Sequence, residues 1–210
     1  MIYYKDDLTQ LYLGDSRQLI HEITGYDLIL TGPPYGLRLN YGVGIDDWKP
    51  DREFWKILYK NSTENCKLIT NVGTYNMCWW LDEIRAAGWI YHHTGCYYNT
   101  RKEERTFDRF PHCWEPIFFF SKNDTFELYK DNTKLYTDVY KHYAPSGQSH
   151  PCPNDLSAFK HVLELIEFET LFDPFSGIGT SLLCARDKGK KSIGIEQNSK
   201  FCDEFIAKLK

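Results

Sequence analysis

The chain of 210 residues has no long hydrophobic run. Its clearest apolar stretch, Ile117 to Phe120, has the length of a strand, whereas a membrane-spanning helix needs roughly 18 or more apolar residues. The first seven residues lack the basic and then apolar order of a signal peptide. With 42% hydrophobic and 26% charged residues, the composition excludes a disordered or fibrous chain. We therefore expect a cytoplasmic globular protein without a membrane partner, organised as one domain over residues 1–210.

Metal-binding patterns and an excess of positive charge are also missing. The seven cysteines are an odd number and none stands in a C-x-x-C pair, which favours reduced thiols and predicts no metal site. The net charge of −4 is unfavourable for a partner made of phosphates. The aromatic content of 16% is high, however, and supplies flat rings on which a nucleobase can stack.

The order of the expected elements indicates an α/β fold. Phe159, Val162, Leu163 and Ile166 recur at helical spacing and predict a helix that begins near Asp155 or Ser157. Other helices are expected around residues 16–22, 52–60, 79–87, 182–189 and 201–209, and strands at 11–13, 26–30, 67–71, 117–121, 171–172 and 192–195. Residues 122–149 are expected to be loops or an extended connection. The strand, glycine turn, helix and strand at the C-terminal end predict a mostly parallel, doubly wound sheet with helices on both faces.

A glycine turn after the strand at 171–172 is a candidate cofactor site. Gly177 and Gly179 lie between a strand and a helix, where the backbone can approach a ligand and the helix N-terminus favours an anionic group. Glu196 ends the next strand, where a carboxylate can bind the two hydroxyls of a ribose. Residue 182 is Leu, so the dinucleotide pattern G-x-G-x-x-G is not met. S-adenosylmethionine fits at least as well as a dinucleotide, and a dinucleotide-dependent oxidoreductase remains a remote alternative.

A second candidate site follows the strand at 26–30. Thr31, Gly32, Pro33, Pro34 and Tyr35 leave the sheet at a carboxyl end, where open α/β sheets bind ligands. The two prolines make the turn rigid and leave carbonyls that can accept hydrogen bonds from an amino group. Tyr35 can stack on a planar ring. The same residues are also compatible with a plain structural turn.

Together these segments resemble the DNA amino-methyltransferases that modify adenine N6 or cytosine N4, in the permuted motif order of the β class and of the size of small phage members. Residues 31–36 resemble the catalytic motif (D/N/S)-P-P-(Y/F/W), and Asp173 to Thr180 match the cofactor motif D-P-F-x-G-x-G-T at every fixed position. Residues 13–16, 114–122, 150–153 and 193–196 are similar to further segments of the class. The catalytic motif precedes the cofactor motif, whereas enzymes that methylate glutamine amides or RNA bases often have the opposite order. The resemblance spans residues 11–206, only loosely over 37–109, and implies a Rossmann-like methyltransferase fold.

The resemblance implies roles for particular residues. S-adenosylmethionine would lie across Asp173, Phe175, Gly177, Gly179 and Thr180, with Glu196 on its ribose, Asp15 near its adenine and His150 in a further cofactor element. The target base of double-stranded DNA would be flipped out of the helix, because its amino group is out of reach inside the duplex. Tyr35 would then stack on the flipped base, while acceptors of the catalytic motif orient its amino group.

Two positions depart from the pattern of the class. Gly32 stands where the class has Asp, Asn or Ser, so one acceptor for the target amine is missing. Three interpretations remain: an active enzyme in which water, Thr31 or a backbone oxygen replaces the acceptor, a cytosine-type enzyme, or an impaired protein that binds DNA and cofactor without turnover. Asn154 and Asp155 replace the usual Lys-Pro, which removes a positive charge near the expected cofactor carboxylate.

DNA contacts are expected in the middle of the chain. Arg101, Lys102, Arg105 and Arg109 form the most basic stretch, although acidic neighbours dilute it and a solvated surface is the simpler interpretation. Residues 123–149 are the expected target-recognition insertion. Because this segment is short, we expect a brief target site or the help of a second subunit; members of the class often form homodimers.

Overall fold

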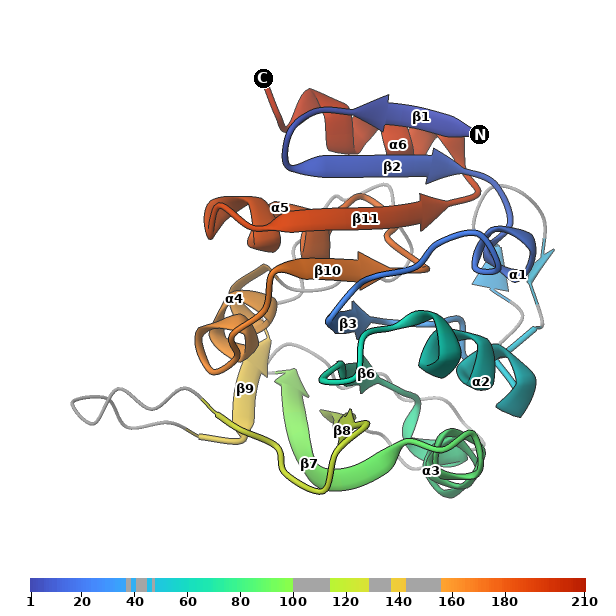
Figure 1. Ribbon diagram of the computed structural model, residues 1–210, viewed down its shortest axis with the longest axis vertical. Helices are drawn as coiled ribbons and strands as arrows, with labels where there is room; N and C mark the ends of the chain where they lie inside the picture. The colour runs from blue at the N-terminus through green and yellow to red at the C-terminus, as the bar shows by residue number, and fades with distance from the viewer. Residues whose placement is uncertain (37–38, 41–44, 47, 100–113, 129–136, 143–155) are drawn as a thin grey trace.

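The structure, a computed structural model, describes residues 1–36, 39–40, 45–46, 48–99, 114–128, 137–142 and 156–210. Its centre is a nine-stranded sheet in the order β1-β2-β11-β10-β3-β6-β8-β7-β9 (Figure 1). The strands are β1 (Ile2–Lys5), β2 (Thr9–Leu13), β3 (Leu28–Thr31), β6 (Lys67–Asn71), β7 (Ile90–Asn99), β8 (Trp114–Ser121), β9 (Val139–His142), β10 (Thr170–Asp173) and β11 (Lys191–Glu196). A separate short pair joins β4 (Leu39–Asn40) to β5 (Ile45–Asp46).

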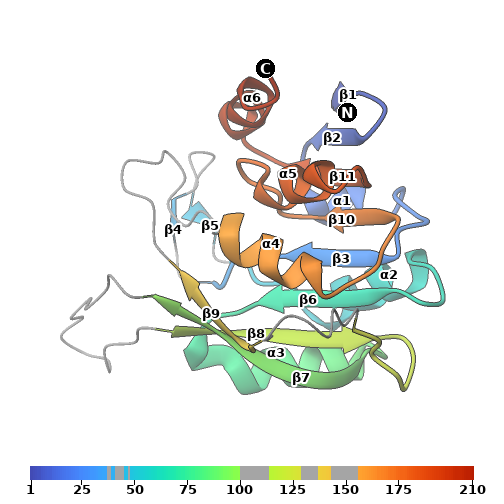
Figure 2. The ribbon, with the colours of Figure 1, turned by 90° about the vertical axis from the view of Figure 1, so that its left-hand side faces the viewer.

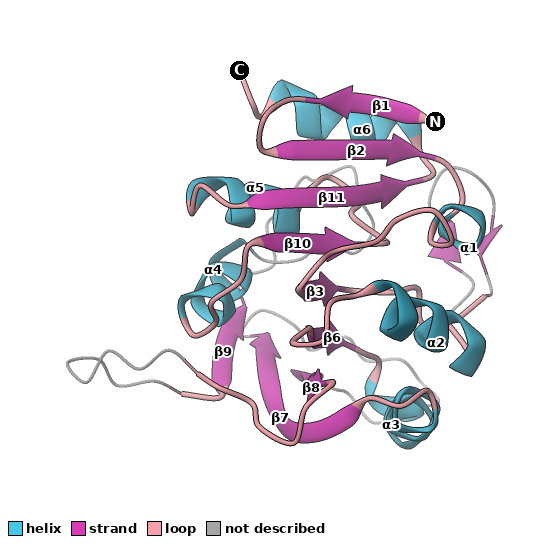
Figure 3. Ribbon diagram, viewed as in Figure 1, coloured by secondary structure: helices cyan, strands magenta, loops and turns pink. Residues whose placement is uncertain are grey.

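The sheet is mostly parallel, as the sequence predicts. Neighbouring strands from β2 to β6 pair in parallel, whereas β1 runs against β2 and β8 runs against both β6 and β7. The arrows of β2, β11 and β10 accordingly point to one side in Figure 3, and β1 points to the other. The carboxyl ends of the parallel strands therefore share one edge of the sheet.

Helices cover both faces of the sheet. They are α1 (Ser16–Leu19), α2 (Arg52–Asn61), α3 (Met77–Ala86), α4 (Leu156–Glu164), α5 (Thr180–Asp187) and α6 (Ser199–Ala207), with a 3₁₀ turn at Thr74–Asn76. Two buried clusters separate the faces: α4, α5 and α6 contribute to one, and α1, α2 and α3 pack against the other. Figure 2 shows α4 and α5 on the near side of the sheet, with α3 behind it. In the part of the chain that the structure describes, no helix is long and apolar enough to cross a membrane.

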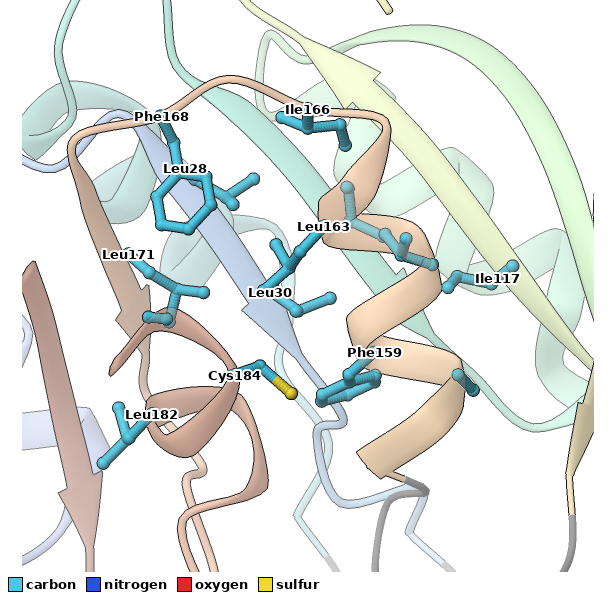
Figure 4. Packing of buried hydrophobic residues seen from close by; sticks show 14 of the residues in the cluster. Leu28, Leu30, Ile117, Phe159, Leu163, Ile166, Phe168, Leu171, Leu182 and Cys184 are labelled. Atoms are coloured by element: carbon cyan, nitrogen blue, oxygen red, sulfur yellow. The ribbon is translucent and has the colours of Figure 1, made fainter. Parts of the chain in front are cut away.

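The apolar spacing of α4 explains its packing. Phe159, Val162 and Leu163 are almost fully buried and belong to one hydrophobic cluster with Leu28 and Leu30 of β3 and Leu171 of β10. Figure 4 shows Leu163 pointing toward Leu30. Burying each such side chain stabilises the fold by about 1.5–3 kcal/mol. The apolar spacing that predicts this helix from the sequence thus marks the face by which α4 packs into the core.

Several predictions of elements are confirmed and others were incomplete. The strand at 67–71 coincides with β6, and the C-terminal strand–helix–strand unit is β10, α5 and β11. The prediction of loops for residues 122–149 was wrong in part, because β9 pairs with β7 inside this segment. Strands β1 and β7 were not predicted: β1 is a short edge strand, and β7 carries polar residues at several positions where a buried strand would be apolar.

The connections that follow β3 and β10 indicate where a ligand would bind. β3 and β10 are neighbours, but β3 leads into α2 on one face and β10 leads into α5 on the other. Where the connections of adjacent parallel strands diverge in this way, the carboxyl ends of an open α/β sheet bind ligands.

Candidate active site

The two predicted motifs meet at this point of divergence. Thr31 ends β3 and Asp173 ends β10, 142 positions apart in the sequence, and the Thr31 hydroxyl donates a hydrogen bond of 2.7 Å to Asp173 Oδ1. Both side chains are almost completely buried. The structure therefore brings the predicted catalytic segment and the predicted cofactor segment into direct contact.

The Asp173 carboxylate organises the start of the glycine turn. Besides Thr31, it accepts hydrogen bonds from the Ser181 hydroxyl in the first turn of α5 and from the Phe175 backbone N–H at 3.0 Å. Burial raises the pKa of Asp173 to about 6, against the opposing effect of these hydrogen bonds. Both carboxylate oxygens of Asp173 accept hydrogen bonds from other residues of the chain, so Asp173 stabilises the conformation of the glycine turn.

The glycines of the turn differ in what they do. Gly177 and Gly179 have positive φ angles of 53° and 79°, which favour glycine. A Cβ on Gly179 would lie 2.1 Å from the ring of Phe205 in α6, so this glycine is needed for packing. Gly179 also precedes α5 without a side-chain cap, and Thr180 is the first residue of the helix. The N–H groups of this helix end face the carboxyl edge of the sheet and suit an anion.

Glu196 lies beside this turn at the end of β11. Its carboxylate accepts hydrogen bonds from the backbone N–H of Gly177 at 2.9 Å and of Asn198 at 2.7 Å, one on each oxygen. Burial raises the pKa of Glu196 to about 7. Each carboxylate oxygen has a second lone pair, so the pair of oxygens can still accept the two hydroxyls of a ribose.

Asp15 lies on the adjoining loop. The backbone N–H of Gly14 donates to the Glu196 carbonyl at 2.9 Å, and the Ser16 hydroxyl donates to the carbonyl of Pro174, so α1 is tied to the cofactor turn. Asp15 caps α1 and pairs with the Arg17 guanidinium, which lowers the pKa of its carboxyl group. The structure thus places Asp15, Glu196 and the glycine turn on the same edge.

Phe175 lies on the face of the sheet that α2 and α3 cover. Its ring stacks on Phe54 of α2 with centroids 5.4 Å apart, and Trp48 lies 6.0 Å away. Phe175 is half-buried in this aromatic cluster, which joins α2 to the cofactor turn.

Tyr35 extends from the predicted catalytic segment toward β6 and β8. The Asn71 side-chain amide donates to its hydroxyl at 2.7 Å, and the hydroxyl donates to Glu115 Oε2 at 3.2 Å. Neither partner was predicted as a site residue. For Asn71, the available indication was its place as the last residue of a buried strand, at the carboxyl edge.

A comparison with protein families decides what this arrangement is. The N6/N4 methyltransferase family model, described as DNA methylase, matches residues 26–208. The chain belongs to this DNA methylase family. Among curated protein sequences, none is similar enough to the methylase to count as a match.

Solved structures with the same fold include named DNA methyltransferases. M1.HpyAVI in complex with SAM aligns with a TM-score of 0.77 at 16% identity, over 96% of the methylase and 100% of that chain. The cytosine-N4-specific PvuII DNA methyltransferase aligns with a TM-score of 0.78 at 15% identity, over 95% and 86%. A putative DNA modification methylase from Thermus thermophilus, complexed with S-adenosyl-L-methionine, aligns with a TM-score of 0.67 at 15% identity, over 95% and 93%. At these identities the likeness shows a shared fold, which agrees with the fold predicted from the sequence.

Gly32 departs from the predicted catalytic motif, and the structure bears on which group could replace the missing acceptor. Gly32 is not among the glycines with a positive φ, so its backbone would also accept Asp, Asn or Ser. The side chain of Thr31 is fully buried and its hydroxyl donates to Asp173, so this hydroxyl is not on the surface that a target base could reach. Backbone oxygens and water are the remaining candidates.

Some predicted residues of the methylase lie outside the described part of the chain. These are Arg101, Lys102, Arg105, Arg109 and His150, together with parts of the predicted recognition insertion at 123–149. Among the described residues, no group of three or more His, Cys, Asp or Glu side chains could hold a metal ion.

Proposed function

We propose that this methylase transfers a methyl group from S-adenosylmethionine to the exocyclic amino group of an adenine or cytosine that is flipped out of double-stranded DNA. The observation that carries the proposal is the hydrogen bond between Thr31 and Asp173, at 2.7 Å. It joins the segment expected to bind the base to the segment expected to bind the cofactor, and it does so at the ligand-binding edge of the sheet.

The residues at this edge suit S-adenosylmethionine, which supplies the methyl group on a sulfonium. Glu196 is a buried carboxylate whose orientation is fixed by two backbone N–H groups, as a ribose-binding residue requires. The uncapped start of α5 suits the carboxylate of the methionine part. Asp15 lies on the loop that the Gly14 N–H joins to the Glu196 carbonyl, and we infer that its carboxylate accepts a hydrogen bond from the adenine amino group of the cofactor.

The residues that we expect to bind the target base align its amino group with the methyl group. Tyr35 provides a half-buried ring for stacking, and the backbone carbonyls of the rigid Pro33-Pro34 turn accept hydrogen bonds from the target amine. Such bonds orient the nitrogen lone pair, and alignment of reacting atoms can account for much of an enzyme's rate enhancement. The acceptor missing at Gly32 lowers the rate, by analogy with the loss of one oxyanion-hole donor, which costs about 2.7–4 kcal/mol.

The DNA contact we propose is small. The 29 acidic residues outnumber the 25 Lys and Arg residues, so much of the surface repels phosphates, and Arg101, Lys102, Arg105 and Arg109 are the candidates for phosphate contacts. Binding should therefore release few counterions and depend weakly on salt. The segment 123–149 is short for sequence recognition, which favours a brief target site or the help of a second copy of the chain.

The test is a labelling assay with tritiated S-adenosylmethionine and unmethylated duplex DNA amplified from a whole bacterial genome. We expect the wild-type protein to label the DNA and Gly32→Asp to change the rate at least tenfold, and mass spectrometry of the nucleosides then identifies methyladenine or methylcytosine. Absence of label with both proteins, while DNA and S-adenosylhomocysteine still bind, would refute methyl transfer. Binding of NADH in place of S-adenosylhomocysteine would refute the cofactor.

A further inference from the structure

The hydroxyl of Tyr35 is held between two side chains from other strands. Asn71 donates to it at 2.7 Å, and it donates in turn to Glu115 at 3.2 Å. Asn71 is the last residue of β6 and only 6% exposed, and Glu115 is the second residue of β8. The three residues come from segments that are 36 and 80 positions apart in the sequence.

The strand pairing fixes where these two partners lie. β6 and β8 are antiparallel, and Asn71 is paired with Ile117, two residues beyond Glu115. Side chains two residues apart on a strand point to the same face, and paired residues also share a face, so Asn71 and Glu115 lie on one face at the carboxyl edge of β6. The backbone N–H of Val72 donates to the carbonyl of Pro116 at 3.1 Å and closes the pair at this end.

The backbone of Gly73 packs against the ring of Tyr35. A Cβ at this position would lie 3.4 Å from Tyr35 Cδ2, so the glycine backbone passes close to the ring. The ring is thus backed by Gly73 and oriented at its hydroxyl end by Asn71 and Glu115. A tyrosine held in this way has already lost the rotational freedom that stacking on a base would otherwise cost.

We propose that Asn71 and Glu115 are positioning residues that orient Tyr35 for stacking on the flipped base. The proposal rests on the function proposed above and adds that the Tyr35 hydroxyl, and not only its ring, contributes to turnover. The two residues act through Tyr35, so their effects and the effect of removing the hydroxyl belong to one interaction.

A kinetic double-mutant cycle tests the proposal. Glu115→Leu removes one hydrogen bond of the Tyr35 hydroxyl and should lower kcat about fivefold. Tyr35→Phe removes both hydrogen bonds of the hydroxyl and should lower kcat at least as much, while the Kd for S-adenosylhomocysteine stays the same in both variants. The double variant should be no slower than Tyr35→Phe alone, and Glu115→Gln, whose amide oxygen can still accept from tyrosine, should recover most of the rate. Tyr91→Phe removes a hydroxyl at the far end of β7, bonded to Thr94, and serves as the matched control with unchanged kcat. Multiplied losses in the double variant, or equal losses with Gln and Leu, would overturn the proposal.

A second measurement, of protein stability, tests the proposal without requiring methyltransferase activity. Urea denaturation of the wild type, Tyr35→Phe, Glu115→Leu and the double variant measures whether Tyr35 and Glu115 stabilise the fold as a pair. We expect the midpoint shift of the double variant to equal that of Tyr35→Phe alone. If the midpoint shifts of the two single variants add up in the double variant, the proposed interaction between Tyr35 and Glu115 is wrong, even in a protein that labels no DNA. If the shifts do not add up but the wild type labels no DNA, the interaction stands and the proposed function is wrong.

Discussion

Replacing Thr31 by Val tests the contact that joins the two motifs. Valine matches the shape of threonine and removes the hydroxyl that donates to Asp173. Burial raises the pKa of Asp173 from 3.8 to about 6, so ionising this carboxyl at pH 8 costs the folded state about 3 kcal/mol, at about 1.4 kcal/mol per pH unit. The contribution of Asp173 to stability is thus fully present below pH 3.8 and is lost as the pH rises through about 6.

The size of the effect of Thr31→Val should therefore depend on pH. At pH 8, where Asp173 is ionised, the variant loses a hydrogen bond to a charged group, and the free energy of unfolding should fall by about 1.5–3 kcal/mol. At pH 5, where Asp173 is mostly protonated, the loss should be about 1 kcal/mol, as for a neutral hydrogen bond. Urea denaturation at the two pH values measures both quantities.

Thr70→Val is the matched control for this experiment. Thr70 is fully buried, directly opposite Thr31 in the pairing of β3 with β6, and its hydroxyl donates to the backbone carbonyl of Asn71 at 3.4 Å. Its replacement should cost the same at pH 5 and pH 8, because no titrating carboxyl group is bonded to it. Equal losses for Thr31→Val at both pH values would refute the role assigned to Asp173.

Two further predictions concern the cofactor turn. Gly179→Ala should lower the free energy of unfolding by at least about 2 kcal/mol in urea denaturation, because its Cβ would lie 2.1 Å from Phe205 at a φ of 79°. Gly25→Ala, at a φ of 82° with no atom within 4 Å, should cost only about 1–2 kcal/mol, and similar losses at both sites would count against the packing role. The affinity for S-adenosylhomocysteine, measured by calorimetry, should rise between pH 6 and pH 8, because ribose hydroxyls donate to ionised Glu196, whose pKa is about 7. Glu196→Gln should bind more weakly at pH 8 and show no such rise; a pH-dependent affinity that persists in this variant would assign the titration to another group.

Local patterns were sufficient to predict the elements that bear the two motifs. The glycines at 177 and 179 mark a turn that few other residues can adopt, and the apolar runs before and after it have the length of buried strands. The prediction of β6 and of the C-terminal unit depended on such short-range features. These features also decide which loop ends at the carboxyl edge, so the general place of the site could be predicted.

Contacts between distant segments could not be predicted in the same way. The bond between Thr31 and Asp173 and the one between Tyr35 and Glu115 depend on which strands are neighbours, and a single sequence carries no pairing information. β9 was missed for a related reason: it is a short edge strand, and it pairs where Gly95 leaves room, since a Cβ there would lie 2.9 Å from the carbonyl oxygen of Asp138.

The strand order also has a consequence for how the chain folds. β10 and β11, the last strands in the sequence, lie between β2 and β3, which are among the first. A growing chain that has not yet reached Thr170 can pair β2 only with β1 and β3 only with β6, so one edge of each of these two strands remains unpaired. The sheet can therefore close only after almost the whole chain has been synthesised, and contacts of this sequence separation make folding slow.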